Sequence, residues 1–529
     1  MTITPTSRII LLKNPIEIDY MNELTFTSLE NQYNYFYNLP KLECENATYQ
    51  RKDEVVRFPT GGNNSEGVTY EDLLEYNYCM YQNSAFDDKW FYAFVKNVTF
   101  DNPGMSYIEL ETDVYQTWLF DLTFKNSYVE REHVNNDTVG LHTVPEGLEL
   151  GEFIVNSHLS DNYNNDLTIV MGATLTPGEF LPLTGGIYGG IYSGIKYYRY
   201  DSVDTLNTYL NQYQDGRSDA VIDLFLAPKW LCGGNTTNIP IANSNSPSTQ
   251  DLGISKITSL NGYTPKNKKL LTSPFCYIIV SNSTGQANTL RQEVWNTNNN
   301  SEMVLRMYGT LTPGCSIRAV PINYNGTEFN YDESITLGKF PQLNWATDQY
   351  TNWLTQQGVS IGAIRLNAEQ AGVANGVANI IGGTLLGSRG DTTGGTMVGS
   401  GINGIYSTMQ ESYRRQLVPN TIEGNINSGD VTTGIGANRF HCYKMSIKQE
   451  YAKIIDDYMS AYGYKVNSYK IPNMTGRRNW NYVKTIGCNI EGTIPQNDMQ
   501  KIKQIFNNGV TLWHNPNTFL DYSQDNSII

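Results

Sequence analysis

One segment of the 529-residue chain, from Gly358 to Gly404, limits what the chain can fold into more than any other. More than a quarter of its residues are glycine, compared with under a tenth of the whole chain, and no charge occurs between Gln370 and Ser388. Glycine loses more backbone entropy on folding than any other residue, so this run does not favour a rigid core. Its apolar side chains also need shelter from water, which indicates a protein cavity or a lipid bilayer as a second environment.

Large aliphatic residues and closely spaced glycines are the candidate functional residues of this segment. They are Ile361, Ile364, Gly372, Val373, Gly376, Val377, Ile380, Ile381, Gly383, Leu385, Leu386, Gly387, Met397, Val398, Ile402 and Ile405. Small residues four positions apart let helices approach closely in a bilayer. The residues leave three interpretations open: a membrane-active or plug segment, a buried helical hairpin, and a flexible linker. The many large aliphatic side chains count against a linker.

The rest of the sequence is typical of several mainly β domains. The chain is longer than one hydrophobic core supports, so about two to four domains are expected. Its 37 tyrosines, together with threonine, favour strands, while Asn, Gly and Ser supply turns. Short strands separated by turn clusters in residues 1–135 predict a β-barrel or sandwich.

The middle of the chain, residues 136–340, is expected to be β-rich with a few short helices. Apolar residues at helical spacing predict helices over Asp204–Tyr213 and Ser218–Phe225. The repeated GGIY in residues 185–192 predicts a hairpin with glycine at the bend.

The C-terminal residues 433–529 predict an α+β domain. One amphipathic helix is expected to end before Gly463 and another before Gly509, because glycine commonly follows the last helical turn. The first helix is expected to place Ile454 and Ile455 on its buried face. The second is expected to bury Met499, Ile502, Ile505 and Phe506.

Charge and cysteine content exclude several classes of protein. The net charge of −15 disfavours tight binding to nucleic acid, whose phosphates are also negative. A soluble acidic surface is the simplest interpretation, and a negative channel through which DNA slides is the alternative. Seven scattered cysteines without a CxxC pair argue against a disulfide framework or structural zinc site, and fit a reducing cytoplasm. The N-terminal apolar run is too short for a signal peptide, and no stretch is a convincing transmembrane helix.

No catalytic residue, metal site or cofactor is predicted. The five histidines form no HExxH motif and no pair at metal-ligand spacing. His133 lies between carboxylates and is expected in a surface ion-pair cluster. His441 and Cys442 are adjacent, so on a strand they are expected to point to opposite faces.

Short blocks at both ends of the chain occur in an order that resembles one protein family. They are NQYNYF (31–36), DKWFYAFV (88–95), QTWLFD (116–121), REHV (131–134), EGL (146–148), YGYKVN (462–467), NYVKT (481–485) and IFNNGVTLWH (505–514). Together they resemble the tail knob, or distal tail tube, proteins of small short-tailed phages of Gram-positive bacteria, of the Bacillus picovirus type. The resemblance covers both ends, while residues 150–340 diverge.

The resemblance implies a mainly β fold of barrel or sandwich domains with a few short helices, arranged as a ring or tube. It divides the chain into an N-terminal tube domain (1–135), a divergent middle (136–340), a hydrophobic loop with its flanks (341–432) and a C-terminal α+β tube domain (433–529). It also implies a homohexamer around a channel through which genomic DNA passes without specific binding. The loops, here residues 358–404, would plug the channel and later insert into host membrane lipid as a pore.

The resemblance further implies contacts with other tail proteins, namely the tail tube or lower collar and tail-tip proteins, and no enzymatic activity. The protein would assemble in the host cytoplasm, belong to the virion tail and act at the host cell envelope. Two alternatives remain. Residues 150–340 could form a receptor-binding adhesin for wall polysaccharide, or the chain could be a cell-wall hydrolase, which needs paired carboxylates across a cleft.

Overall fold

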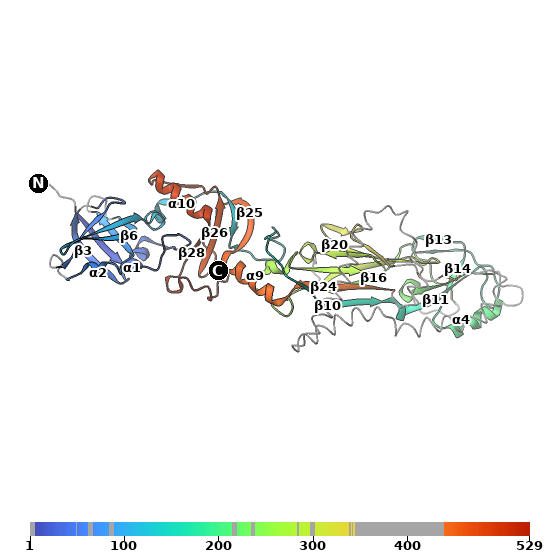
Figure 1. The fold of residues 1–529 in the computed structure, drawn as a ribbon. Helices are drawn as coiled ribbons and strands as arrows, with labels where there is room; N and C mark the ends of the chain where they lie inside the picture. Colours follow the sequence, from blue (N-terminus) through green and yellow to red (C-terminus); the bar gives the residue numbers. More distant parts are fainter. Residues whose placement is uncertain are drawn as a thin grey trace, which may run out of the picture. The chain divides into compact units, whose positions relative to one another are not determined.

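The chain folds into two compact units that are built mainly from β-sheets. A computed structural model describes residues 6–48, 50–61, 67–83, 89–213, 220–233, 239–282, 285–296, 302–337, 340, 342–343 and 438–529 (Figure 1). Unit 1 contains both ends of the chain, residues 1–148 and 454–529, and unit 2 contains residues 149–453. Several sheets and a few short helices confirm the predicted mainly β, multidomain fold. The boundaries of the four predicted domains stay a prediction.

The N-terminal part of unit 1 is a six-stranded sheet in the order β3-β1-β5-β6-β7-β4. All neighbouring strands are antiparallel, and the two edge strands lie against each other, so the sheet curls into a barrel. The strands are β1 (Thr6–Leu12), β3 (Lys41–Thr48), β4 (Val56–Pro59), β5 (Tyr78–Asn83), β6 (Trp90–Asn102) and β7 (Met105–Thr112). The helices are α1 (Leu29–Tyr37), α2 (Tyr70–Leu73), α3 (Val114–Trp118) and the 3-10 helix η2 (Leu119–Asp121).

Apolar residues of the barrel strands alternate between two cores, as the period of two along a strand requires. On β1, Ile9 and Leu11 join a cluster that collects side chains from all six strands. Ile10 joins a second cluster on the other face, which also contains Trp480 and Trp513. The C-terminal tryptophans therefore complete a core of the N-terminal barrel.

The second sheet of unit 1 joins strands from both ends of the chain in the order β2-β28-β26-β9-β25. The β2–β28 pair is parallel and the other pairs are antiparallel. Its strands are β2 (Asn22–Leu24), β9 (Ser127–Glu132), β25 (Tyr464–Lys470), β26 (Trp480–Ile486) and β28 (Val510–Trp513). A ribbon of β8 (Leu122–Phe124) with β27 (Ile490–Gly492) and the 3-10 helix η11 (Pro516–Thr518) complete the unit.

Two C-terminal helices follow the predicted spacing with one exception. Helix α10 (Gln496–Asn508) buries Ile502, Ile505 and Phe506 and is capped by Gly509, as predicted. Helix α9 (Gln449–Tyr462) is followed by Gly463, also as predicted. The expectation that Ile454 is buried is wrong, because its side chain is 67% exposed. The buried stripe is Ala452, Ile455 and Met459. Adjacent residues lie about 100° apart around a helix, so Ile454 points away from this stripe.

Unit 2 contains three sheets of four or five strands among its described residues. The first has the order β10-β24-β17-β18, with β10 (Phe153–Asn162), β17 (Cys276–Ser281), β18 (Ala287–Leu290) and β24 (Arg439–Ile447). The second has the order β14-β11-β15-β23, with β11 (Leu167–Ala173), β14 (Lys196–Tyr200), β15 (Val221–Pro228) and β23 (Gln342–Leu343). The third contains β16 (Ser248–Ser255), β19 (Glu302–Gly309), β20 (Ile317–Tyr324), β21 (Thr327–Phe329) and β22 (Ile335–Leu337).

Short elements of unit 2 confirm the predicted hairpin and one of the two predicted helices. Strands β12 (Gly186–Tyr188) and β13 (Ile191–Ser193) pair around Gly189 and Gly190, which both have positive φ. The predicted helix over Asp204–Tyr213 is present as α4 (Val203–Leu210) and the 3-10 helix η4 (Asn211–Tyr213). The other described 3-10 helices are η3 (Tyr163–Asp166), η6 (Lys229–Cys232), η7 (Lys268–Leu271) and η8 (Gln292–Val294).

The predicted helix over Ser218–Phe225 is wrong, because strand β15 occupies its C-terminal half. The strand pairs with β11 on one side and with β23 on the other. Val221 and Leu224 are buried in the same core as α4. The two ladders and the β-branched residues favour a central strand over the local helical spacing.

Candidate functional site

The residues predicted to act in the membrane, from Ile361 to Ile405, lie outside the described residues. The described chain ends at Leu343 on one side of them and resumes at Asn438 on the other. The strands at these two points, β23 and β24, both belong to unit 2. They show how the fold holds the ends of the intervening segment.

The C-terminal anchor is β24, which is a central strand of its sheet. It pairs with β10 on one side and with β17 on the other, and Arg439 lies opposite Asn162 at its start. The backbone N–H of Tyr163 donates a hydrogen bond to the carbonyl of Asn438, with an N···O distance of 3.1 Å. Ladders on both edges therefore fix this end of the segment.

The N-terminal anchor is β23, which pairs with β15 so that Leu343 lies opposite Leu224. On its other edge, β15 pairs with β11. The 3-10 helix η3 is the short connection from β10 to β11. The sheets that hold the two ends of segment 344–437 are therefore joined by one tight connection, and the segment starts and ends in the same unit.

A pair of histidines lies on β10 and β24 beside the C-terminal anchor. Nε2 of His158 is 2.8 Å from Nδ1 of His441, and the His158 ring stacks on Tyr443 with ring centroids 4.6 Å apart. Burial lowers the pKa of both imidazoles, that of His441 to about 3. Both rings are therefore neutral near pH 7, and they pack as aromatic side chains rather than as charged groups.

His441 and Cys442 point to opposite faces of β24, as predicted. Their partners on β10 are Ser160 and Leu159, which are adjacent and therefore alternate as well. Burial raises the pKa of the Cys442 thiol to about 12. The protonated thiol is a poor nucleophile, and the imidazole lies on the other side of the strand.

The expectation that His133 belongs to a surface ion-pair cluster is wrong. Its side chain is buried, Nε2 lies 3.0 Å from the carbonyl oxygen of Ser460, and Nδ1 accepts a hydrogen bond from the N–H of Tyr482. Burial lowers the pKa of His133 to about 3. Its neighbours Arg131 and Glu132 do form ion pairs, so the charged sequence around it was no guide to its own position.

Within the described ranges, no three His, Cys, Asp or Glu residues are grouped closely enough to hold a metal ion. The seven cysteines are free thiols, and all except Cys44 are buried. Among the helices that the structure describes, none is both long enough and apolar enough to cross a membrane.

Comparison with known families decides where the chain belongs. A family model described as the C-terminal domain of the tail knob protein gp9 of Bacillus phage phi29 matches residues 229–527, which is more than half of the chain. The chain belongs to this tail knob protein family. A second model, described as the N-terminus of the caudoviral major tail protein, matches residues 5–123, which hold the barrel of unit 1.

Individual tail knob proteins match over almost the whole chain. The chain is 26% identical to tail knob protein gp9 of Bacillus phage phi29, and the match covers 98% of each chain. It is 25% identical to the gp9 protein of Bacillus phage PZA with the same coverage, and 24% identical to that of Bacillus phage B103 over 97% of each chain. The structure of the tail knob protein gp12 of bacteriophage C1 matches 99% of this chain and 100% of its own, with a TM-score of 0.65 and 16% identity, which shows a shared fold.

The chain is thus a structural tail knob protein of a short-tailed phage and a component of the virion tail. The family predicted from the sequence blocks is confirmed. The full-length matches also carry the similarity through residues 150–340, where the blocks had indicated divergence.

Proposed function

We propose that this tail knob protein assembles as a homohexamer around a channel for DNA, and that its six copies of segment 358–404 plug the channel and then insert into the host membrane as a pore. The observation that carries the proposal is the sequence of the segment, which is glycine-rich, aliphatic and free of charge from Gln370 to Ser388. Its place between β23 and β24, in a chain of the tail knob family, supports the same role.

The two environments explain the composition of the segment. Six segments in one lumen bury their apolar side chains against each other, and a bilayer later provides the same shelter. Glycine keeps the barrier between the two arrangements low, because it restricts the backbone least. The anchors β23 and β24 both lie in unit 2, so the segment changes environment while its ends stay in their sheets.

The rest of the molecule is suited to a tube wall. The match of residues 5–123 to a major tail protein model supports a place for the barrel in that wall. The net charge of −15 would repel the phosphates of DNA and let it pass without binding. In this role the protein contacts lipid and other tail proteins and catalyses no reaction.

Leakage of a dye from liposomes tests the segment. A variant with Ile380→Asp and Ile381→Asp is expected to reduce leakage at least tenfold, because an acidic side chain in the middle of a bilayer costs about 2.5–3.5 kcal/mol. The matched control changes Ile191→Asp and Ile222→Asp, two isoleucines that are already exposed in unit 2. The control is expected to leak like the unmodified protein.

Deletion of residues 358–404 separates the pore from the ring. The shortened chain is expected to remain a hexamer, with six times its own reduced mass by native mass spectrometry, and to cause no leakage. Equal leakage with and without the segment would contradict the pore, and a monomeric mass for the full chain under all assembly conditions would contradict the ring.

A further inference from the structure

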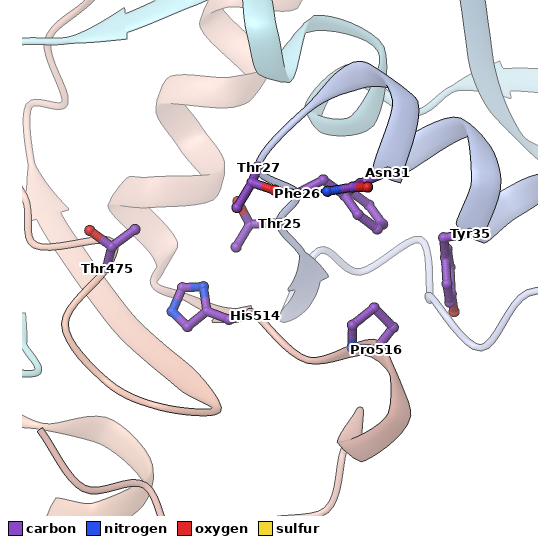
Figure 2. A pocket seen from close by; sticks show the side chains of 8 residues that line it. All are labelled: Thr25, Phe26, Thr27, Asn31, Tyr35, Thr475, His514 and Pro516. Atoms are coloured by element: carbon purple, nitrogen blue, oxygen red, sulfur yellow. Dashed lines mark hydrogen bonds between the residues drawn. The ribbon is translucent and has the colours of Figure 1, made fainter. Parts of the chain in front are cut away.

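Unit 1 contains a pocket of about 310 Å³ whose walls come from both ends of the chain (Figure 2). Thr25, Phe26 and Thr27 lie between β2 and α1, and Asn31 and Tyr35 belong to α1. The pocket exists because β2 and β28 are parallel neighbours, with Leu24, the last residue of β2, opposite the last residue of β28. The chain therefore leaves both strands at the same edge of the sheet.

The opposite wall comes from residues near the C-terminus. His514 directly follows β28, Pro516 begins the 3-10 helix η11, and Thr475 lies in the loop before β26. Figure 2 shows His514 and Pro516 in the lower part of the view, opposite Phe26, Thr27 and Asn31 in the upper part, with Tyr35 at the right. The walls thus combine hydroxyl groups, an imidazole and an aromatic ring.

The His514 imidazole is a neutral hydrogen-bond acceptor. Burial lowers its pKa, and its Nε2 lies 2.9 Å from Oδ1 of Asn481. The amide of Asn481 is oriented by its own nitrogen, which donates to the carbonyl of Asn473, so Oδ1 faces the imidazole. Nε2 therefore carries the hydrogen. The side-chain hydrogen bond of His514 among the described residues is this one at Nε2, and Nδ1 keeps a lone pair.

Other polar groups also line the pocket. The amide nitrogen of Asn31 donates to Oγ1 of Thr27 at 2.9 Å, which leaves the Asn31 carbonyl oxygen as an acceptor and the Thr27 hydroxyl as a donor. Burial raises the pKa of Tyr35 to about 12, so its hydroxyl is protonated and can donate. The rings of Tyr35 and Phe26 have centroids 5.6 Å apart, and both lie at the pocket.

This chemistry selects one class of ligand. No lining residue carries a formal charge, so the pocket offers no charged partner to a phosphate or a carboxylate. The free donors and acceptors would be left unpaired by a purely apolar molecule. A sugar ring presents hydroxyls that both donate and accept, and a C–H face that packs on aromatic rings. We propose that this pocket of unit 1 binds one neutral saccharide ring, a hexose or an N-acetylhexosamine.

The size of the pocket agrees with a single ring. Ligand pockets usually measure about 300–1,000 Å³, and this pocket lies at the lower end of that range. The proposal concerns unit 1 alone and does not depend on the pore formed by segment 358–404. A sugar site here would let the tail knob engage carbohydrate at a place separate from the membrane-active segment.

Saturation-transfer NMR on the full-length protein tests the site with glucose, galactose and N-acetylglucosamine as probes. At least one sugar is expected to receive magnetisation on its C–H protons, and glycerol phosphate is expected to receive none. Tyr35→Ala is expected to weaken the binding at least tenfold, and Thr27→Val, which keeps the shape of the side chain, several-fold. Tyr469→Ala removes a tyrosine that is 69% exposed on β25, outside the pocket, and is expected to bind like the unmodified protein.

Circular dichroism of each variant shows whether it is folded. Absence of transfer to all three sugars overturns the proposal. So does transfer in folded Tyr35→Ala and Thr27→Val that equals transfer in the unmodified protein. A pocket filled by a second copy of the chain also overturns it. In that case, Tyr35→Ala would form a smaller particle than the unmodified protein. The sugars would receive no magnetisation from any variant. Leakage of liposomes is unaffected by either result, so a failure here is separate from a failure of the proposed pore.

Discussion

Glu23 and Asp113 place two carboxyl groups in the interior of unit 1. Glu23 lies on β2 and Asp113 caps α3, and neither side chain reaches water. Asp113 accepts hydrogen bonds from the Tyr78 hydroxyl at 2.7 Å and from the N–H of Gln116 at 3.0 Å. The Gln116 side chain also donates to one oxygen of Glu23, whose other oxygen has no partner among the described residues. Burial raises the pKa of both carboxyls, and the charge of Asp113 raises that of Glu23 further.

The raised pKa of Glu23 predicts that this residue destabilises the fold as pH rises. Below the unfolded-state pKa of about 4.3, Glu23 is protonated in both the folded and the unfolded chain. Above it, the unfolded chain releases the proton while the folded chain keeps it, and this favours unfolding. Glu23→Gln removes the titration, so it is expected to stabilise the protein by about 1–3 kcal/mol at pH 7 and by much less at pH 4. Urea unfolding at both pH values measures this. Glu109→Gln, at an exposed position on β7, is the control for losing one carboxylate. If the gain in the free energy of unfolding of Glu23→Gln does not grow between pH 4 and pH 7, the raised pKa of Glu23 is contradicted.

The turn between α9 and β25 depends on Gly463 for two reasons. Its φ of +66° lies in the left-handed region, which other residues enter at a cost of about 1–2 kcal/mol. A Cβ at this position would also lie 2.2 Å from the carbonyl oxygen of Glu132 on β9, which is closer than any real contact. The glycine therefore lets the helix end directly against the backbone of the sheet.

Gly463→Ala is expected to lower the free energy of unfolding by about 3 kcal/mol or more, because left-handed strain and overpacking add. Gly487→Ala is the matched control, since Gly487 has a φ of +73° but open space around a Cβ. The control is expected to lose only about 1 kcal/mol, from the backbone alone. Urea unfolding followed by tryptophan fluorescence compares the two. Equal losses would show that the contact with Glu132 does not matter.

At the scale of single elements, local patterns predicted where two helices end but did not distinguish a helix from a central strand. Gly463 and Gly509 marked two helix ends correctly, because a glycine after the last turn acts through its own backbone. The predicted helix at the position of β15 was wrong, because Val221 and Leu224 fit the spacing of a helix and that of a buried strand equally well. The partner strands decide such a case, and they are distant in the sequence.

At the scale of the whole molecule, both ends of the chain build unit 1. Trp480 and Trp513 are fully buried in the core of the N-terminal barrel, and β28 pairs with β2. Residues 1–148 alone are expected to aggregate or remain unfolded, because the fragment would expose the apolar face that these tryptophans cover. Co-expression with residues 454–529 is expected to restore a soluble, folded unit, as judged by circular dichroism. A folded and soluble 1–148 fragment would contradict this view.

The sequence by itself determined the mainly β class, the family, the helix ends at glycine and the unusual composition of segment 358–404. Each of these depends on local residue chemistry or on the order of short blocks, which a linear chain displays directly. Only the tertiary structure decided that His133 is buried, that β15 is a central strand and that residues before α1 meet His514 across a pocket. These facts depend on contacts between residues from 48 to several hundred positions apart, and local periodicity carries no information about such pairs.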